Sequence, residues 1–196
     1  MQVIPVKTRI ILPEDDFIDV LLNAIDESGL ELKNNDILGI AETPLGTTEG
    51  RIVSLSEIEP SEEAKKLAMK YELLPEIAEL VIEEADDILG GIPHVVLTIK
   101  NNTLMANAGV DKSNAPPGHA SLLPLNPRAS ADRLRNEIKS RLGITIGVII
   151  IDSRTQPLTG KHWNGSWCFW ILSCCGRART EGLVWECYAH HAKSYR

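Results

Sequence analysis

Apolar residues recur at helical spacing in four stretches of the chain. The four stretches are residues 15–28, 61–71, 75–89 and 126–141. A spacing of three and four positions places such side chains on one face of a helix, so each stretch predicts an amphipathic helix. Asn126 and Pro127 suit an N-cap followed by a first-turn proline. The two middle helices begin with acidic residues, which suit the positive end of the helix dipole.

Short runs of apolar and β-branched residues between these stretches predict strands. The five runs are residues 3–6, 36–41, 95–100, 103–106 and 144–151. Asn101 and Asn102 separate two of the runs and predict a hairpin turn, and Gly46 and Gly50 are expected to mark further turns. The run 144–151 contains almost no polar residue, so we expect a strand that is buried on both faces. Strands that alternate with helices around a central sheet predict an α+β, or mixed α/β, fold.

The composition is typical of a folded protein. Of the 196 residues, 43% are hydrophobic and 24% are charged, which is ordinary for a globular chain. The formal net charge of −7 argues against a broad basic surface, so we expect no nucleic-acid partner. No basic-then-apolar leader begins the sequence, and no apolar run approaches the roughly 20 residues of a membrane helix. We therefore expect a cytoplasmic protein with no membrane partner.

The composition changes abruptly near Leu158. All four Cys and all four Trp lie between residues 162 and 188. Residues 1–158 carry 15 basic and 25 acidic residues, whereas residues 159–196 carry 5 basic and 2 acidic residues. We therefore expect residues 1–158 to form an incomplete domain and residues 159–196 to be an atypical Cys/Trp-rich tail. Our hypothesis is that this tail is read out of frame, the alternative being a genuine extension, and the gene sequence around codon 158 tests it.

A zinc site is a second interpretation of the tail, because thiolates and imidazoles are the ligands that zinc prefers. The candidate ligands are Cys168, Cys174, Cys175, Cys187, His190 and His191. Their spacing lacks the paired C-x₂-C knuckles of structural zinc sites, which disfavours this interpretation.

Two segments place a carboxylate at the end of a predicted strand. Asp111 follows the hairpin strand, and Asp152 follows the buried run. Ligands bind at such positions in open α/β structures, and carboxylate and hydroxyl oxygens suit Mg²⁺ or Mn²⁺. Alternatively, Asp111 begins an Asx-turn and Asp152 caps a loop. The sequence contains neither a Walker A motif nor a Rossmann glycine fingerprint, so neither of those motifs predicts nucleotide binding.

Four segments, in order along the chain, resemble a known family. They read Asn-Ala-Gly-Val-Asp-Lys-Ser-Asn at 107–114, Ser-Leu-Leu-Pro-Leu-Asn-Pro at 121–127, Ser-Ala-Asp-Arg-Leu-Arg at 130–135 and Val-Ile-Ile-Ile-Asp-Ser-Arg at 148–154. From about residue 5 to residue 158 the chain resembles the archaeal-type coenzyme F(420)-0:gamma-glutamyl ligase family. The resemblance implies a ligase of coenzyme F420 biosynthesis that forms homodimers. It also implies that the enzyme uses GTP and a divalent metal to add L-glutamate to coenzyme F(420)-0 through a gamma-glutamyl amide bond.

The same resemblance implies roles for five residues. Metal ligation, with magnesium or manganese as the ion, is expected of Asp111, Asp152 and the hydroxyl group of Ser153. Contacts with the guanine nucleotide are expected of Asn114 and Thr43. No residue is assigned a catalytic role.

The sequence departs from the family pattern in three places. Where the family has a Ser-Thr pair and then a lysine that faces the nucleotide, this chain has Glu42, Thr43 and Thr47, so a phosphate-facing cation is missing. Residues 8–12 stand in place of a Leu-Pro nucleotide loop, and the family pattern is not recognisable after residue 158. We therefore expect little or no ligase activity from this chain. The alternative function is that of a non-catalytic fragment or binding module with the same fold.

Overall fold

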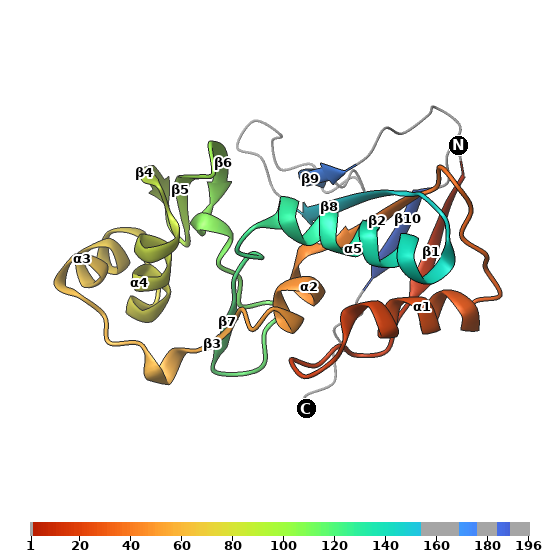
Figure 1. The fold of residues 1–196 in the computed structure, drawn as a ribbon. Coiled ribbons are helices and arrows are strands. Elements are labelled where there is room, and N and C mark those ends of the chain that lie inside the picture. The colour runs from red at the N-terminus through yellow and green to blue at the C-terminus, as the bar shows by residue number, and fades with distance from the viewer. Residues whose placement is uncertain (1, 154–168, 176–183, 189–196) are drawn as a thin grey trace. The chain divides into compact units, whose positions relative to one another are not determined.

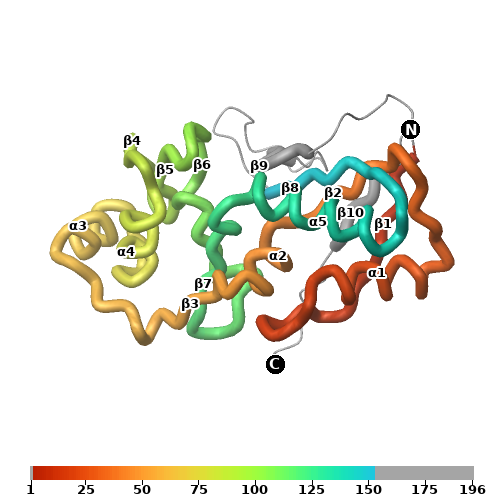
Figure 2. Tube along the Cα trace, in the orientation of Figure 1, coloured from red at the N-terminus to blue at the C-terminus, as the bar shows by residue number. Residues whose placement is uncertain are grey.

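The computed structural model describes residues 2–153, 169–175 and 184–188. The chain divides into two compact units, of which the first is Met1–Gly50 with Pro124–Arg196 and the second is Arg51–Leu123. Figure 2 shows the chain leaving the first unit once and returning to it once. The boundary expected at residue 158 lies outside the described residues.

A five-stranded sheet forms the centre of the first unit (Figure 1). The strand order is β1-β10-β2-β8-β9, and only β9 runs antiparallel to its neighbour. The strands are β1 (Val3–Lys7), β2 (Ile37–Ala41), β8 (Gly147–Ser153), β9 (Phe169–Cys175) and β10 (Val184–Tyr188). Parallel strands need crossover connections, which the helices between β1, β2 and β8 supply. The predicted mixed α+β fold with a central sheet is confirmed.

Three helices accompany this sheet, and two of them begin at a side-chain cap, of which the one at Asn126 was predicted. They are α1 (Phe17–Glu27), α2 (Glu42–Thr48) and α5 (Pro127–Leu142). The side chain of Asp16 accepts hydrogen bonds from two N–H groups of the first turn of α1, and Asn126 does the same for one N–H group of α5. Gly143 ends α5 with a φ of +72°, a conformation that glycine adopts without strain.

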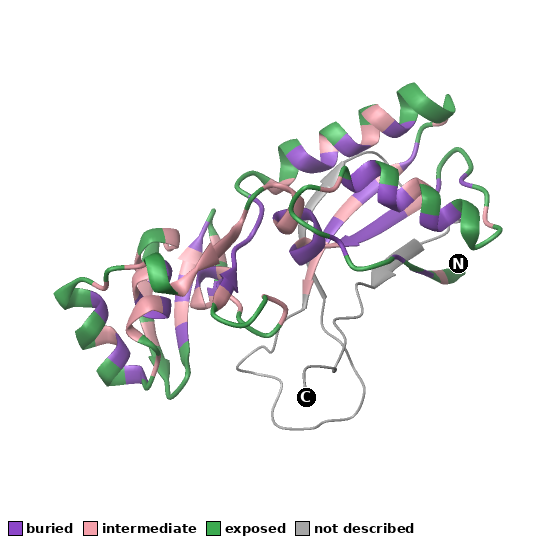
Figure 3. Ribbon diagram, turned by 90° about the horizontal axis from the view of Figure 1, so that it is seen from below, coloured by how far each residue is buried: buried purple, intermediate pink, exposed green. Residues whose placement is uncertain are grey.

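One continuous core joins these helices to the sheet. The apolar side chains of the helices and of alternate strand positions are buried together, as the stripes in Figure 3 show. The most completely buried members are Leu21, Leu38, Ile40, Leu45, Leu134, Ile138 and Ile150. Because successive strand residues point to opposite faces, this set defines one covered face of the sheet.

The strand β8 differs from its prediction in two respects. It begins at Gly147, three residues later than expected, and it is not buried equally on both faces. Val148 and Ile150 are fully buried, whereas Ile149 and Ile151 are only half-buried. The hydrophobic run could not reveal this difference, because it carries apolar residues on both faces while the described helices cover only one.

The second unit contains two helices and two small antiparallel sheets. The helices are α3 (Glu62–Tyr71) and α4 (Pro75–Glu84). One sheet has the order β4-β5-β6 and the other pairs β3 with β7. The strands are β3 (Ile52–Ser54), β4 (Asp87–Ile92), β5 (Val95–Lys100), β6 (Thr103–Ala106) and β7 (His119–Ser121), with short 3₁₀ turns η1 (Leu55–Glu57) and η2 (Asn107–Gly109). No helix in the described part of the chain is long and apolar enough to cross a bilayer.

The hairpin of β5 and β6 matches the sequence prediction. Asn101 and Asn102 connect the strands with φ values of +50° and +58°, as a type I′ hairpin turn requires. Asparagine tolerates this left-handed region better than most residues. The Asn-Asn pair was therefore a reliable local signal.

Two other local predictions were wrong. The helix expected over 75–89 ends at Glu84, and residues 87–89 belong to β4. At Gly91 in this strand a Cβ atom would overlap the carbonyl oxygen of Val95, so the close pairing with β5 requires glycine. Gly46, expected in a turn, is buried inside α2, whereas Gly50 does follow that helix with a φ of +72°.

Candidate functional site

A left-handed turn leads from β6 to Asp111. Asn107, Ala108 and Gly109 have φ values of +50°, +52° and +78°. Ala108 is an L-residue with a Cβ atom and is almost completely buried, so its left-handed conformation is strained unless neighbouring groups hold it. At Gly109 a Cβ atom would overlap the side chain of Leu123, so this position requires glycine for space as well as for its φ. Consecutive strained residues of this kind are concentrated at functional sites.

The backbone of Asp111 is fixed by β7. Its N–H group donates to the carbonyl oxygen of Ser121 at 3.0 Å, and its carbonyl oxygen accepts from the N–H group of Ser121 at 2.7 Å. The hydroxyl group of Ser121 also donates to this carbonyl, at 3.2 Å. The backbone from which the Asp111 side chain extends is therefore held in place by three hydrogen bonds.

The carboxylate of Asp111 is oriented by the loop that follows. One oxygen accepts the N–H group of Ser113 at 3.0 Å, and the other accepts the Ser113 hydroxyl at 2.7 Å and the N–H group of Asn114 at 3.2 Å. This is the Asx-turn that the sequence offered as an alternative, and it is confirmed. An ionised carboxylate has about four lone-pair sites, so three donors leave capacity for a cation. The oxygen chemistry of this residue fits Mg²⁺ or Mn²⁺.

Asn114 lies beside Asp111 through this turn. It is half-buried, and its backbone N–H group points at the carboxylate. The predicted nucleotide residue and the predicted metal ligand are therefore neighbours in the second unit.

Asp152 and Ser153 are the last two residues of β8. Asp152 is half-buried and pairs with Trp170 of β9, so it lies inside the strand and not just past its end as expected. The strand continues because β9 supplies a hydrogen-bonding partner that the hydrophobic run could not reveal. Asp152 belongs to the first unit and Asp111 to the second, so their sharing of one metal ion stays a prediction.

Thr43 follows the strand next to β8. Ala41, the last residue of β2, pairs with Ile151, so the carboxyl ends of the two parallel strands lie at the same edge of the sheet. Thr43 is buried in the first turn of α2, and its hydroxyl group donates to the carboxylate of Glu42 at 2.7 Å. Thr43, just after β2, and Asp152, near the end of β8, therefore lie at the same edge of the sheet, the position at which open α/β sheets bind ligands.

A polar contact that sequence reasoning missed joins two segments of the first unit. The carboxylate of Glu49 accepts the Ser130 hydroxyl at 2.6 Å and the Arg133 guanidinium at 2.8 Å. Glu49 follows α2, and both donors lie on α5. The α5 donors lie in a segment that resembles the family, but no spacing rule connects them with Glu49, more than eighty positions earlier.

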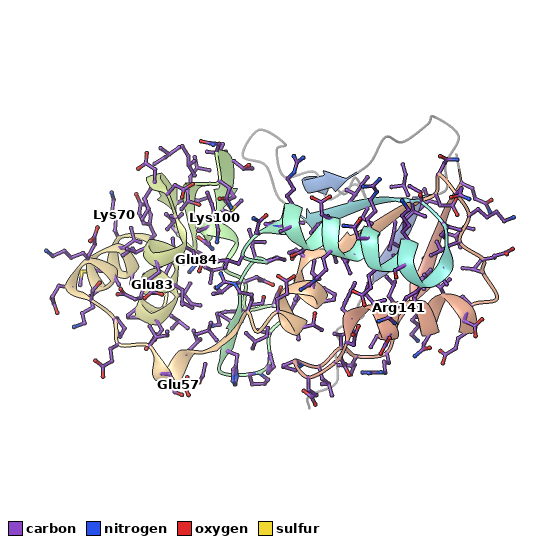
Figure 4. The ribbon with its side chains drawn as sticks, viewed as in Figure 1. Glu57, Lys70, Glu83, Glu84, Lys100 and Arg141 are labelled. Atoms are coloured by element: carbon purple, nitrogen blue, oxygen red, sulfur yellow. The ribbon has the colours of Figure 1, made fainter. Side chains whose placement is uncertain are left out.

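A second missed contact lies inside the second unit. The guanidinium of Arg51 binds both carboxylate oxygens of Glu84, at 2.7 and 2.8 Å, and its Nε donates to the carbonyl of Leu123 at 2.9 Å. Lys100 also binds Glu84 (Figure 4). Burial raises the pKa of the Glu84 carboxyl, but the hydrogen bonds from Lys100 and Arg51 outweigh it, so this pKa lies below its ordinary value.

No group of three or more His, Cys, Asp or Glu side chains gathers into a metal cluster within the described ranges. Of the zinc candidates in the tail, Cys174, Cys175 and Cys187 lie in β9 and β10, and the others lie outside the described residues. The zinc interpretation therefore stays untested.

The sequence is similar to one family model and to several curated proteins, all of which carry names of the same ligase family. The sequence model of the family described as F420-0:Gamma-glutamyl ligase matches residues 5–164. The chain is 41% identical over 150 residues to the Coenzyme F420:L-glutamate ligase of Methanopyrus kandleri, covering 76% of this chain and 58% of the relative. It is 35% identical to the protein of that name from Methanothermobacter thermautotrophicus, covering 73% of this chain and 57% of the relative.

The Coenzyme F420:L-glutamate ligase of Archaeoglobus fulgidus is 33% identical, over 78% of this chain and 60% of the relative. The chain thus spans about three fifths of the length of the curated relatives that it matches. The family match covers the predicted metal and nucleotide residues, from Thr43 to Ser153. On this evidence the chain belongs to the F420-0:gamma-glutamyl ligase family.

Proposed function

We propose that this chain carries the metal and nucleotide residues of a ligase that adds L-glutamate to coenzyme F420-0 with GTP and Mg²⁺ or Mn²⁺. The observation that carries the proposal is the Asp111 carboxylate, which is oriented by hydrogen bonds from Ser113 and Asn114. The backbone of Asp111 is fixed by Ser121. The proposal is supported by family membership and by the names of the relatives, which specify glutamate ligation to F420.

Amide formation from a carboxylate requires that one oxygen first becomes a leaving group. In the proposed reaction an oxygen of the acceptor carboxylate attacks the γ-phosphorus of GTP, which gives an acyl phosphate and releases GDP. The amine of L-glutamate then attacks the acyl carbon, the C–O bond to phosphate breaks, and the amine loses a proton. A bound divalent ion supplies neutralisation of the phosphate charge.

The residues proposed for the metal are Asp111, Asp152 and Ser153. All three offer hard oxygen donors, which suit Mg²⁺ and Mn²⁺. Asn114 and Thr43 are proposed to contact the nucleotide. Two features support this grouping: the N–H bond from Asn114 to Asp111, and the shared sheet edge of Thr43 and Asp152.

We also propose that the protein forms a homodimer. One face of the β4-β5-β6 sheet packs on the unit's core through Val96 and Met105, whereas the opposite face carries apolar side chains. On that face Ile92 is 66% exposed and Leu104 is 44% exposed. A second copy would remove such side chains from water, which is the driving force of association. Light scattering after size-exclusion chromatography tests the dimer, and a monomeric mass at micromolar concentration contradicts it.

The function is tested first by nucleotide binding. We expect a fluorescent GTP analogue to bind the chain in the presence of Mn²⁺ and to dissociate when a chelator is added. Asp111→Asn and Asp152→Asn should both weaken this binding, whereas Asp26→Asn, on the exposed side of α1, should not. Equal binding with and without Mn²⁺, or no loss in either Asp variant, would contradict the proposal.

Product formation is the second test. The chain is incubated with coenzyme F420-0, L-glutamate, GTP and Mn²⁺, and mass spectrometry detects the addition of one glutamate residue. Metal-dependent GTP binding without product favours the alternative, a binding module of the same fold, and agrees with the low activity expected from the sequence. Robust turnover shows that expectation to be wrong and supports the ligase.

A further inference from the structure

Thr98 is the buried group that holds the turn leading to Asp111. It lies in the middle of β5 and is fully buried. Its hydroxyl group accepts the N–H group of Ala108 at 2.9 Å and donates to the carbonyl oxygen of Met105 at 2.8 Å. The hydroxyl therefore satisfies one buried donor and one carbonyl acceptor on either side of the start of the left-handed turn.

Asn107 provides a second connection to the same strand. Its side-chain oxygen accepts the N–H group of Val96 at 2.7 Å. The turn itself is closed by the N–H group of Val110, which donates to the carbonyl of Asn107 at 2.8 Å. The strained segment 107–109 is thus attached to β5 at two points, and both attachments are side-chain hydrogen bonds.

The position of Asp111 depends on this segment. Asp111 is separated from Gly109 by one residue, and its side chain starts where the turn meets β7. We infer that Thr98 is a positioning residue for the divalent cation: its hydroxyl holds the left-handed turn 107–109, and the turn aims the Asp111 carboxylate at the ion. This inference rests on the proposed function, because it takes Asp111 as a metal ligand.

The expected effect follows from how metal sites depend on supporting groups. Removing a residue that orients a ligand lowers metal affinity by about 10–100-fold. Valine has nearly the shape of threonine but no hydroxyl, so Thr98→Val leaves the Ala108 N–H and the Met105 carbonyl without this partner. Thr98→Ser keeps the hydroxyl and should retain the affinity to within a few-fold.

The experiment measures the Mn²⁺ dissociation constant of the full chain by electron paramagnetic resonance, which reports free Mn²⁺. Thr98→Val should raise this constant by about 10–100-fold, and Thr98→Ser should restore it. Hydrogen exchange of the Ala108 amide should accelerate in Thr98→Val and not in Thr98→Ser. Thr103→Val, in the neighbouring β6, is the matched control, because its hydroxyl donates only to the Asn101 carbonyl at the hairpin turn.

A control variant with reduced stability shows whether a weaker Mn²⁺ affinity comes from general destabilisation or from misplacement of the Asp111 carboxylate. Val81→Ala shortens a fully buried side chain of the same unit. It should lower the melting temperature without changing the Mn²⁺ dissociation constant. If Thr98→Val does not fold, Asn107→Gly tests the other half of the inference, that the turn 107–109 positions Asp111. Glycine adopts a φ of +50° freely, and the substitution removes only the second connection, so it should also raise the constant.

Two results would overturn the inference, and they are distinguishable. If Asp111→Asn weakens Mn²⁺ binding but Thr98→Val does not, Thr98 does not position the ligand and the proposed function stands. If Asn107→Gly, used in its place, leaves the constant unchanged, the turn 107–109 does not position Asp111, and the inference fails while the proposed function stands. If Asp111→Asn leaves Mn²⁺ binding unchanged, Asp111 is not a ligand, and the inference and the proposed metal site fail together.

Discussion

Glu84 is the residue whose neutralisation should most disturb the second unit. Its carboxylate lies between Arg51 and Lys100. The side chain of Glu84 is 15% exposed, that of Arg51 is 19% exposed and that of Lys100 is 10% exposed. Glu84→Gln keeps the volume of the side chain but leaves two partly buried cations without their counter-charge. The substitution therefore tests whether this contact stabilises the unit.

The size of the effect follows from the burial. Breaking a buried ion pair by removing one partner costs about 3–5 kcal/mol, and the residual exposure here favours the lower end. A loss of about 3 kcal/mol corresponds to a change of roughly 150-fold in the unfolding equilibrium. Urea unfolding at pH 7, followed by circular dichroism, measures this loss.

Glu83→Gln is the matched control, because Glu83 is the exposed neighbour on the same helix (Figure 4). It should change the free energy of unfolding by less than about 0.5 kcal/mol. The wild type should also lose stability as the pH falls below about 4.5, because the pKa of Glu84 is lower in the folded state than its ordinary value of 4.5. Glu84→Gln should lack this part of the acid dependence. A Glu84→Gln protein as stable as the Glu83→Gln protein would refute the reasoning.

Three further substitutions test the fold and its electrostatics. Ile150→Ala should cost about 2–5 kcal/mol in unfolding free energy, and Ile149→Ala clearly less, because only Ile150 faces the core; equal losses would mean that both faces are covered. Gly91→Ala should cost about 1–3 kcal/mol by forcing β4 away from β5, and a neutral effect in thermal unfolding would show that the pairing is looser. The hydrogen bonds from Arg9 lower the pKa of Asp15 from 3.8 to about 2, so the stability from this pair should be complete above about pH 4 and lost as the pH falls towards 2. An NMR titration that finds the Asp15 carboxyl near 3.8 would contradict this assignment.

The elements that the sequence predicted well are those with local signals. The Asn101-Asn102 turn and the cap at Asn126 depend on residues a few positions apart, and the structure has them in place. The same holds for the Asx-turn at Asp111, whose donors lie two and three residues later.

The elements that the sequence did not predict depend on distant partners. The end of α4 and the start of β4 follow from the pairing of Gly91 with β5, which no helical periodicity contains. The contact of Arg51 with Glu84 joins residues 33 positions apart. In the left-handed turn before Asp111 the Ala108 N–H group donates to the Thr98 hydroxyl, and a threonine inside an apolar strand gives no sign of that contact. The topology of the chain brings these groups together, and the spacing of residues along the sequence does not reveal such contacts.

The proposed function predicts that Asp111 and Asp152 are ligands of the same divalent ion. The most direct measurement is the stoichiometry and affinity of Mn²⁺ binding to the wild type, Asp111→Asn, Asp152→Asn and the double variant. A shared ion predicts one tight site in the wild type and the loss of this site in either single variant. The double variant should show no further loss, because the effects of substituting two ligands of one ion are not additive. Two independent sites, each removed by one substitution, or tight binding that survives both substitutions would contradict the claim.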